Sequence, residues 1–336
     1  MKTAILPFVV LVFHFTLFAQ DVPPAPSRQP DGNRPGPWDN DVIVYRISPG
    51  GSPEQLATFE RAGVPTVARL KDGRLIAAFQ NFPASDDRNF DRVAVRLSDD
   101  EGRTWSETKP IMVAGMEKGL ARPFDPTLVP LPDGRVRLYF TSNRSPDFRR
   151  SPPAIYSAIS TNGIDYAFEP GVRFGVEGRI VIDCAAALHG GMFHLIVPDN
   201  GTTGEFNGGQ DRHQPPRGGT GYHATSQDGL KFERVADIQL PSDRDRWLGN
   251  VQSDGGKLVF FGTGPGPWPV QSTDGANWTT LHTSMRFHGA DPGAVKLRDG
   301  SWLLVVTGEP RPGTPSALQR NRRPVNQPPR RPQNQL

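Results

Sequence analysis

The chain has 336 residues, a formal net charge of +3 and a single cysteine, Cys184. One cysteine excludes an internal disulfide, and 36 glycines with 35 prolines favour short strands and loops over long helices. The positive charge arises in the C-terminal tail, where residues 309–336 hold six arginines and one glutamate. The remaining chain has no basic excess, so no nucleic-acid partner is expected.

The two ends of the chain differ in composition from its middle. Residues 1–20 combine Lys2, an apolar run and the small Ala19, which predicts a signal peptide and a secreted or periplasmic protein. The run is short for a membrane anchor, so no transmembrane segment is expected after cleavage. The Pro/Gly-rich residues 21–39 indicate a linker, and the Arg/Pro/Gln-rich residues 309–336 a disordered tail. Residues 40–308 remain as one domain, expected to be monomeric.

A short motif occurs four times in this domain, with the pattern Ser-x-(Asp/Asn)-(x)-Gly-x-x-aromatic. The copies cover residues 98–105, 160–166, 226–232 and 272–278. The Asp or Asn is expected to accept backbone N–H groups of a turn, the glycine to supply a positive φ, and the aromatic ring to pack beneath. Recurrence at intervals of tens of residues predicts a series of similar β units.

A second pattern, strand–turn–strand, alternates with the motif. Its five copies cover residues 65–79, 125–140, 183–197, 250–262 and 291–306. Each of the first four precedes a motif hairpin, and two hairpins make a four-stranded blade. The fifth has no motif hairpin, so a strand at residues 41–47 is expected to pair there and close the ring. The sequence therefore predicts an all-β, five-bladed β-propeller closed by an N-terminal strand.

The four-fold motif resembles the Asp box, or bacterial neuraminidase repeat, of the sialidase superfamily. This resemblance implies a β-propeller, and because sialidases have six blades, a six-bladed sialidase-type fold is the alternative. Asp boxes also occur in propellers without enzymatic activity, so the motif points to a fold more than to a reaction.

Acidic residues gather at the starts of the inner hairpins. Alignment of the five copies places one residue of each in a ring around the central axis: Val64, Asp125, Asp183, Asn250 and Asp291. Aspartate is disfavoured in strands, and carboxylates close together raise the pKa of at least one of them. A carboxyl that stays protonated near neutral pH can act as an acid, so the ring is the candidate site.

Two of these strand starts, Phe124-Asp125-Pro126 and Ala290-Asp291-Pro292, resemble five-bladed glycosidases of the arabinanase and invertase type. The resemblance implies catalysis by acidic residues on successive inner strands, with a glycan as substrate. We predict Asp125, Asp183 and Asp291 as catalytic residues. Val64 replaces the first-blade carboxylate of those enzymes, and Glu60 is the nearby substitute. The alternative is that these aspartates are architectural and the propeller binds a carbohydrate or protein without chemistry.

Residues 61–105 resemble the first blade of sialidases. By this resemblance Arg61 corresponds to a substrate-binding arginine, suited to grip a carboxylate. Asp87 corresponds to the acid/base, and both residues are predicted at the rim of the site. Asp291 stands where sialidases carry a tyrosine nucleophile, which departs from that family.

Three further residues complete the predicted binding site: Asn250 on the ring, and Trp247 and His288 as walls for a sugar. The ordinary alternative for a tryptophan on a strand is the blade core. The histidines lack the spacing of a zinc site. No cofactor is expected, although oxygen ligands of the ring suit a structural Ca²⁺.

Overall fold

A computed structural model describes residues 37–145, 147–203, 214–240, 242–281 and 288–311. The predicted signal peptide, most of the predicted linker and most of the predicted tail lie outside these residues. The described part forms strands throughout, with one 3-10 turn at Pro37–Asp39. No helix in this part is long and apolar enough to cross a membrane.

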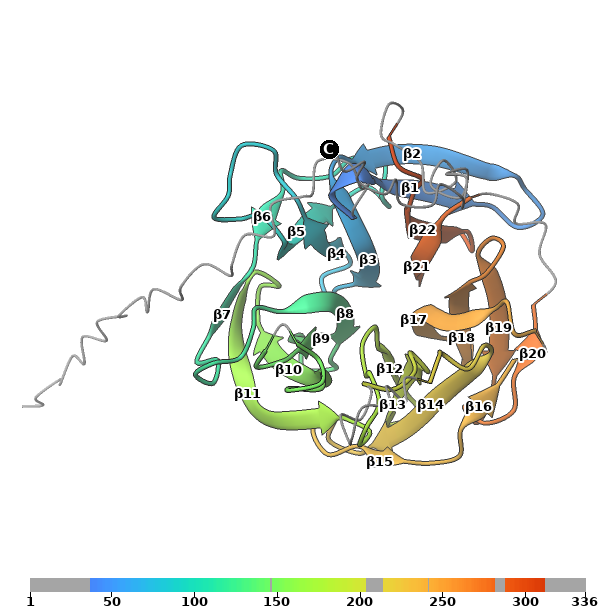
Figure 1. Cartoon of the computed structure of the whole chain (residues 1–336). Coiled ribbons are helices and arrows are strands. Elements are labelled where there is room, and N and C mark those ends of the chain that lie inside the picture. The colour runs from blue at the N-terminus through green and yellow to red at the C-terminus, as the bar shows by residue number, and fades with distance from the viewer. Residues whose placement is uncertain (1–36, 146, 204–213, 241, 282–287, 312–336) are drawn as a thin grey trace, which may run out of the picture.

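Five sheets surround a central axis, each with one strand facing it (Figure 1). The innermost strands are β3 (Ala62–Arg69), β8 (Phe124–Pro130), β12 (Ala185–His189), β17 (Arg246–Asp254) and β21 (Ala290–Lys296). All five come from the predicted inner hairpins. The five-bladed β-propeller is confirmed, and the six-bladed alternative is wrong.

Blades 1 to 4 are built outward from these inner strands. Blade 1 continues with β4 (Leu75–Asn81), β5 (Arg92–Ser98) and β6 (Lys109–Pro110). Blade 2 continues with β9 (Val136–Ser142), β10 (Ala154–Ser160), β11 (Asp165–Phe174) and, parallel to β11, β7 (Met112–Ala114). Blade 3 continues with β13 (Met192–Pro198) and β14 (Thr220–Ser226), which pairs with β15 (Glu233–Arg234) and β16 (Ile238–Gln239). Blade 4 continues with β18 (Lys257–Thr263), β19 (Trp268–Ser272) and β20 (Thr279–Thr280).

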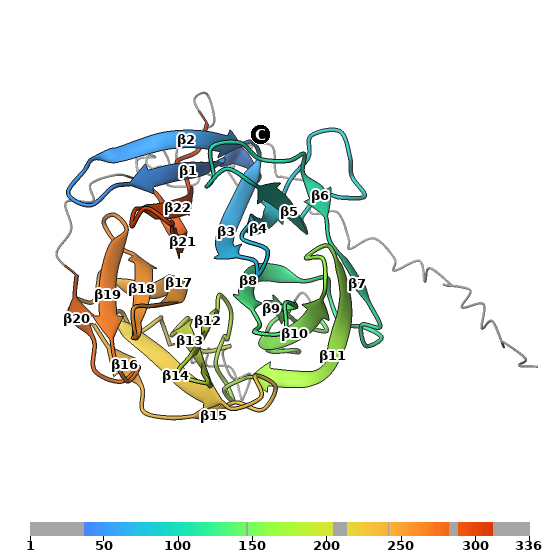
Figure 2. The same cartoon turned by 180° about the vertical axis from the view of Figure 1, so that it is seen from behind.

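Blade 5 joins the two ends of the described chain. Its inner strands are β21 and β22 (Trp302–Thr307), and its outer strands are β1 (Val42–Ile47) and β2 (Pro53–Phe59). Strand β1 pairs antiparallel with β22 along its whole length, from Val42 opposite Thr307 to Ile47 opposite Trp302. Figure 2 shows β1 and β2 on the outside of this blade. The predicted closing strand is confirmed, whereas β2 was not expected, because its run is largely polar and exposed.

The four motif turns share one hydrogen-bond pattern. In the third copy the Ser226 hydroxyl accepts the Gly229 N–H at 2.9 Å, and the Asp228 carboxylate accepts the N–H groups of Leu230 and Lys231 at 2.7 and 3.0 Å. The same contacts recur at the other copies, with Asn162 in the acidic position of the second. The motif glycines have φ between 71° and 85°. Each turn therefore fixes its backbone with one hydroxyl and one Asx side chain.

Ordered structure extends beyond the predicted domain limits. Trp38 packs against Phe82 and Phe90 with ring centroids 6.5 and 6.2 Å apart. At the other end Arg311 donates to the Asp41 carboxylate at 2.9 Å. These contacts attach residues 37–39 and 309–311 to the propeller.

Candidate carboxylate site at the centre of the ring

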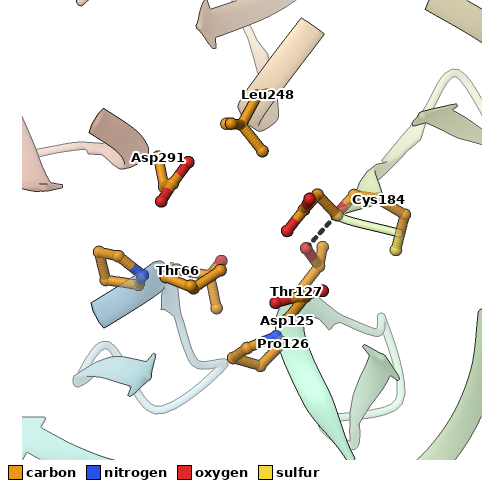
Figure 3. Close-up of a pocket in the computed structure, with 11 residues that line it drawn as sticks. Thr66, Asp125, Pro126, Thr127, Cys184, Leu248 and Asp291 are labelled. Atoms are coloured by element: carbon orange, nitrogen blue, oxygen red, sulfur yellow. Dashed lines mark hydrogen bonds between the residues drawn. The ribbon is translucent and has the colours of Figure 1, made fainter. Parts of the chain in front are cut away.

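A small cavity opens on the axis, where the inner strands begin. Its walls include Val64, Asp125, Asp183, Leu248 and Asp291, one residue from each blade. Figure 3 shows Asp291 on one side of this cavity and Asp125 on another, with Leu248 between blades 3 and 5. The structure therefore brings the three predicted catalytic aspartates together.

An unusual backbone conformation turns these side chains toward the axis. Val64, Asp125, Asp183 and Asp291 have φ of 48°, 50°, 62° and 50°, which is the left-handed region. Aspartate visits this region more readily than most residues, whereas a β-branched residue such as Val64 is a true outlier there. The conformation recurs with and without a carboxylate, so it belongs to the architecture of the ring.

Threonine hydroxyls hold this conformation in place. The N–H groups of Val64, Asp183 and Asp291 donate to the hydroxyls of Thr307, Thr141 and Thr263 at 2.9, 3.3 and 2.8 Å. Each threonine lies at or next to the end of the second strand of the preceding blade in the ring. Sequence reasoning did not identify these threonines, although their repetition at the ends of three inner hairpins was a usable signal.

The fifth ring position is Leu248, not Asn250. Strand pairing places Asn250 opposite Phe261, in the same register as Thr127 opposite Tyr139. Asn250 therefore corresponds to Thr127, which lies two residues after the ring residue Asp125. The prediction that Asn250 belongs to the ring was wrong, because the pairing register of β17 with β18 places Leu248, and not Asn250, level with Asp125 and Asp291.

Asn250 instead bonds to Thr66, a residue of the cavity wall. Its side-chain amide is buried and donates to the Thr66 hydroxyl at 3.0 Å, which joins the inner strands of two non-adjacent blades. Nearby, the Thr127 hydroxyl donates to the Cys184 carbonyl. The space inside the cavity is about 20 Å³, room for roughly one water molecule.

All three carboxyl groups have a raised pKa. Burial is the main cause in each case. The pKa of Asp125 rises to about 7, and the Asp183 carboxyl that hydrogen-bonds to it partly opposes the rise. The pKa of Asp291 also rises to about 7, helped by the charge of Asp183. The pKa of Asp183 rises as well, because burial and the Asp125 charge both disfavour its ionised form. The sequence prediction attributed such shifts to like charges, but loss of hydration is the larger effect.

Among the described residues, the basic Arg246 faces this cluster. Its positive charge lowers the pKa of both Asp183 and Asp291, and its guanidinium donates to the Asn200 side chain. Arg246 begins β17 and has no motif around it. Its role beside the carboxylates therefore follows from tertiary structure alone.

The predicted rim residues of blade 1 lie outside the cavity. The Arg61 side chain donates to the Phe82 carbonyl at 2.6 Å, and its backbone N–H donates to the Asp41 carboxylate at 2.8 Å. Asp87 is exposed on the loop between β4 and β5, and Glu60 is exposed at the turn between β2 and β3. The structure gives Arg61 a structural contact, and a substrate role for Arg61 or Asp87 stays a prediction.

Trp247 is a core residue and cannot form a wall of the site. It is fully buried, its indole N–H donates to the Gly219 carbonyl at 2.9 Å, and its ring packs against Phe260 and Trp278. The prediction of Trp247 as a sugar platform was wrong, because this ring packs in the apolar core between blades 3 and 4. His288 is exposed, with a ring nitrogen 4.0 Å from a Glu309 carboxylate oxygen, and its binding role stays a prediction.

No metal centre emerges in the described part of the chain. Within it, no group of three or more His, Cys, Asp or Glu side chains is arranged to hold a metal ion. The calcium ion considered for the ring thus has no ligand set there, and the hydrogen bond between Asp125 and Asp183 uses oxygens that a cation would need.

Comparison with known proteins identifies the fold. No protein-family model matches the chain, and no curated protein matches it significantly. An N-acetylgalactosamine deacetylase from F. plautii is 14% identical with a TM-score of 0.52, covering 76% of this chain and 81% of its own. An α-L-arabinofuranosidase from Clostridium thermocellum is 11% identical with a TM-score of 0.52, covering 72% of this chain and 80% of its own.

A third solved structure, a GH32 β-fructofuranosidase from Bombyx mori, is 13% identical with a TM-score of 0.51. The match covers 78% of this chain and 56% of that protein. This chain is thus a five-bladed β-propeller of the kind found in glycoside hydrolases. At such identities the similarity concerns the fold, and the reaction has to be argued from the site.

Proposed function

We propose that this protein is a glycoside hydrolase-like propeller that acts on a glycan through Asp125, Asp183 and Asp291. The observation that carries the proposal is the convergence of three carboxyl groups with raised pKa values at the axial cavity. Glycoside hydrolysis needs one protonated and one ionised carboxyl near neutral pH. A left-handed backbone alone would be served as well by asparagine, without the cost of burying a charge.

The cluster divides into two chemical parts. Asp125 and Asp183 are hydrogen-bonded to each other and retain a proton between them. This pair donates the proton to the glycosidic oxygen as its bond to the anomeric carbon breaks. Asp291, with Arg246 favouring its ionised form, either takes a proton from the attacking water or attacks the anomeric carbon itself. The sugar lies over the mouth of the cavity, which is too small to enclose it.

The test is a series of isosteric variants assayed on a panel of glycosides. We expect Asp125→Asn, Asp183→Asn and Asp291→Asn each to lower kcat by about 10²-fold or more. Asp133→Asn is the matched control, because Asp133 is an exposed turn residue paired with Arg135 at the opposite end of β8. Undiminished turnover of a confirmed substrate by both Asp125→Asn and Asp183→Asn would refute the proposal.

A second candidate function is a non-catalytic carbohydrate- or protein-binding propeller. One observation favours it: the space between the carboxyls is about 20 Å³, far below the size of a ligand pocket. If this second function is correct, the wild type binds a glycan and leaves it intact over long incubation. The three Asp→Asn variants then bind the glycan as tightly as the wild type does. Release of reducing sugar by the wild type alone would exclude it.

We also propose that the protein is exported as a monomer, on the strength of the predicted signal peptide. The mass and N-terminal sequence of the mature protein test the cleavage near residue 20. Light scattering on the same material tests its oligomeric state.

A further inference from the structure

Two arginines at the cavity end of blades 1 and 2 have no role in the site described above. Arg92 begins β5, opposite Asn81 at the end of β4, so it lies at the same end of blade 1 as the cavity. Arg122 lies on the connection into blade 2, three residues before Asp125. Both residues therefore lie at the end of blades 1 and 2 at which the cavity opens.

Both arginines carry a buried, unpartnered donor. The Nε–H groups of Arg92 and Arg122 have no hydrogen-bond acceptor within the described residues. Neither residue forms a salt bridge there, whereas Arg69 and Arg137 pair with carboxylates. A buried donor without an acceptor costs free energy, so two at one place indicate a missing acceptor.

The charges around the pair point to the same kind of partner. Burial lowers the pKa of Arg122, and the neighbouring charge of Arg92 lowers it further. Asp91 is the opposing charge, but it already accepts the Gln80 side-chain amide at 2.8 Å. Two guanidinium groups thus repel one another beside one carboxylate, and an anion would relieve both the repulsion and the unmet donors.

We propose that Arg92 and Arg122 form a subsite for an anionic substituent, a carboxylate or a sulfate ester, on the glycan that the proposed site processes. Guanidinium groups match both anions, because they offer parallel N–H donors in a planar fork. The subsite lies on the blade 1 and blade 2 side of Asp125. The inference rests on the proposed function and adds the substrate class, an acidic glycan.

The first test measures binding of simple anions without any turnover. Sodium sulfate and sodium acetate are titrated at constant ionic strength against the full chain, and the thermal midpoint is recorded. We expect a saturable rise for the wild type that Arg92→Gln and Arg122→Gln each abolish. Arg103→Gln is the matched control, because Arg103 is exposed in a motif turn at the opposite end of β5. No saturable rise, or an equal rise in all three variants, would overturn the subsite.

The second test distinguishes a carboxylate from a sulfate ester as the bound group. It also tests the anion subsite separately from the proposed hydrolase activity. Uronate-containing, sulfated and neutral oligosaccharides are compared by calorimetry on the wild type, Arg92→Gln, Arg122→Gln and Asp291→Asn. We expect one acidic class to bind at least about tenfold more tightly than the neutral one, and the preference to vanish in the arginine variants. It should persist in Asp291→Asn. A preference for acidic glycans without hydrolysis supports the subsite and counts against the hydrolase. Hydrolysis of neutral glycans without a preference for acidic ones supports the hydrolase and overturns the subsite.

Discussion

At the scale of single residues, the left-handed backbone conformation of the ring positions does not depend on which side chain stands there. Val64 shows that the left-handed conformation and its bond to a threonine form without a carboxylate. Leu248 shows that the ring also accepts an apolar residue. The three aspartates therefore add something that the architecture does not require, and they add it where burial opposes their ionisation. Perturbed carboxyls in a concave position are candidates for function.

The raised pKa values predict that these carboxyls lower the free energy of unfolding as the pH rises. A carboxyl whose pKa is about 7 in the folded protein binds its proton more tightly than the unfolded chain does. Its stabilising effect is therefore present below about pH 4 and is lost as the pH rises to about 7. We expect Asp291→Asn to match the wild type at pH 4 and to exceed its free energy of unfolding by about 4 kcal/mol at pH 8.

Urea unfolding of the two proteins at both pH values checks this prediction. Asp133→Asn should not show the gain, because Arg135 lowers the pKa of Asp133 and favours its ionised form. If Asp291→Asn has the same stability relative to the wild type at both pH values, the Asp291 carboxyl does not carry the predicted shift.

At the scale of elements, the motif turns use one acceptor for several backbone donors. Asp228 serves two N–H groups of its turn, and the same work is done by an amide oxygen of Asn162 in the second copy. The requirement is for an oxygen at that position and not for a charge. The four turns thus stabilise their hairpins by hydrogen bonds between residues close together in the chain.

This device predicts unequal effects of two substitutions in the third turn. Asp228→Ala removes the acceptor of two N–H groups and should lower the free energy of unfolding by about 1 kcal/mol or more. Asp228→Asn keeps the oxygen and should stay within about 0.5 kcal/mol of the wild type. Chemical denaturation of both variants measures the difference, and equal losses would show that the charge matters more than the hydrogen bonds.

At the scale of the whole molecule, the ring is closed by hydrogen bonds between the ends of the chain. Strand β1 lies between β22 and β2, with Val42 and Val44 fully buried. Without β1, the edge of β22 would be unpaired and its apolar neighbours would meet water. Closure therefore couples the first described strands to the last and holds blade 5, with Asp291, in place.

A charge within the closing strand should destabilise the entire propeller. Val44→Asp buries a carboxylate against Val305, its partner on β22, and should cost at least about 3 kcal/mol. Thr58→Asp places the same side chain on the exposed face of β2 and is the matched control. Thermal unfolding should show one cooperative transition shifted to lower temperature in Val44→Asp alone. Loss of only a minor, separate transition would mean that β1 does not close the ring.

Most of the fold could be read from local patterns. The alternation of two hairpin types gave the blade count, and the strand at residues 41–47 gave the closure. Strand β2 escaped prediction, because an outer strand with one face in water carries little apolar pattern. The three aspartates at the site were also predictable, since they stand at the starts of equivalent inner hairpins.

By itself the sequence determined the five repeated units, their turns and the positions of Asp125, Asp183 and Asp291, because hairpins and Asx turns depend on residues close together in the chain. Only the tertiary structure decided that Leu248 and not Asn250 completes the ring, that Trp247 is core, and that Arg246 faces the carboxyls. These outcomes depend on the register of β17 against β18 and on burial between blades. Register and burial are properties of strands that meet across the ring, so no local pattern encodes them.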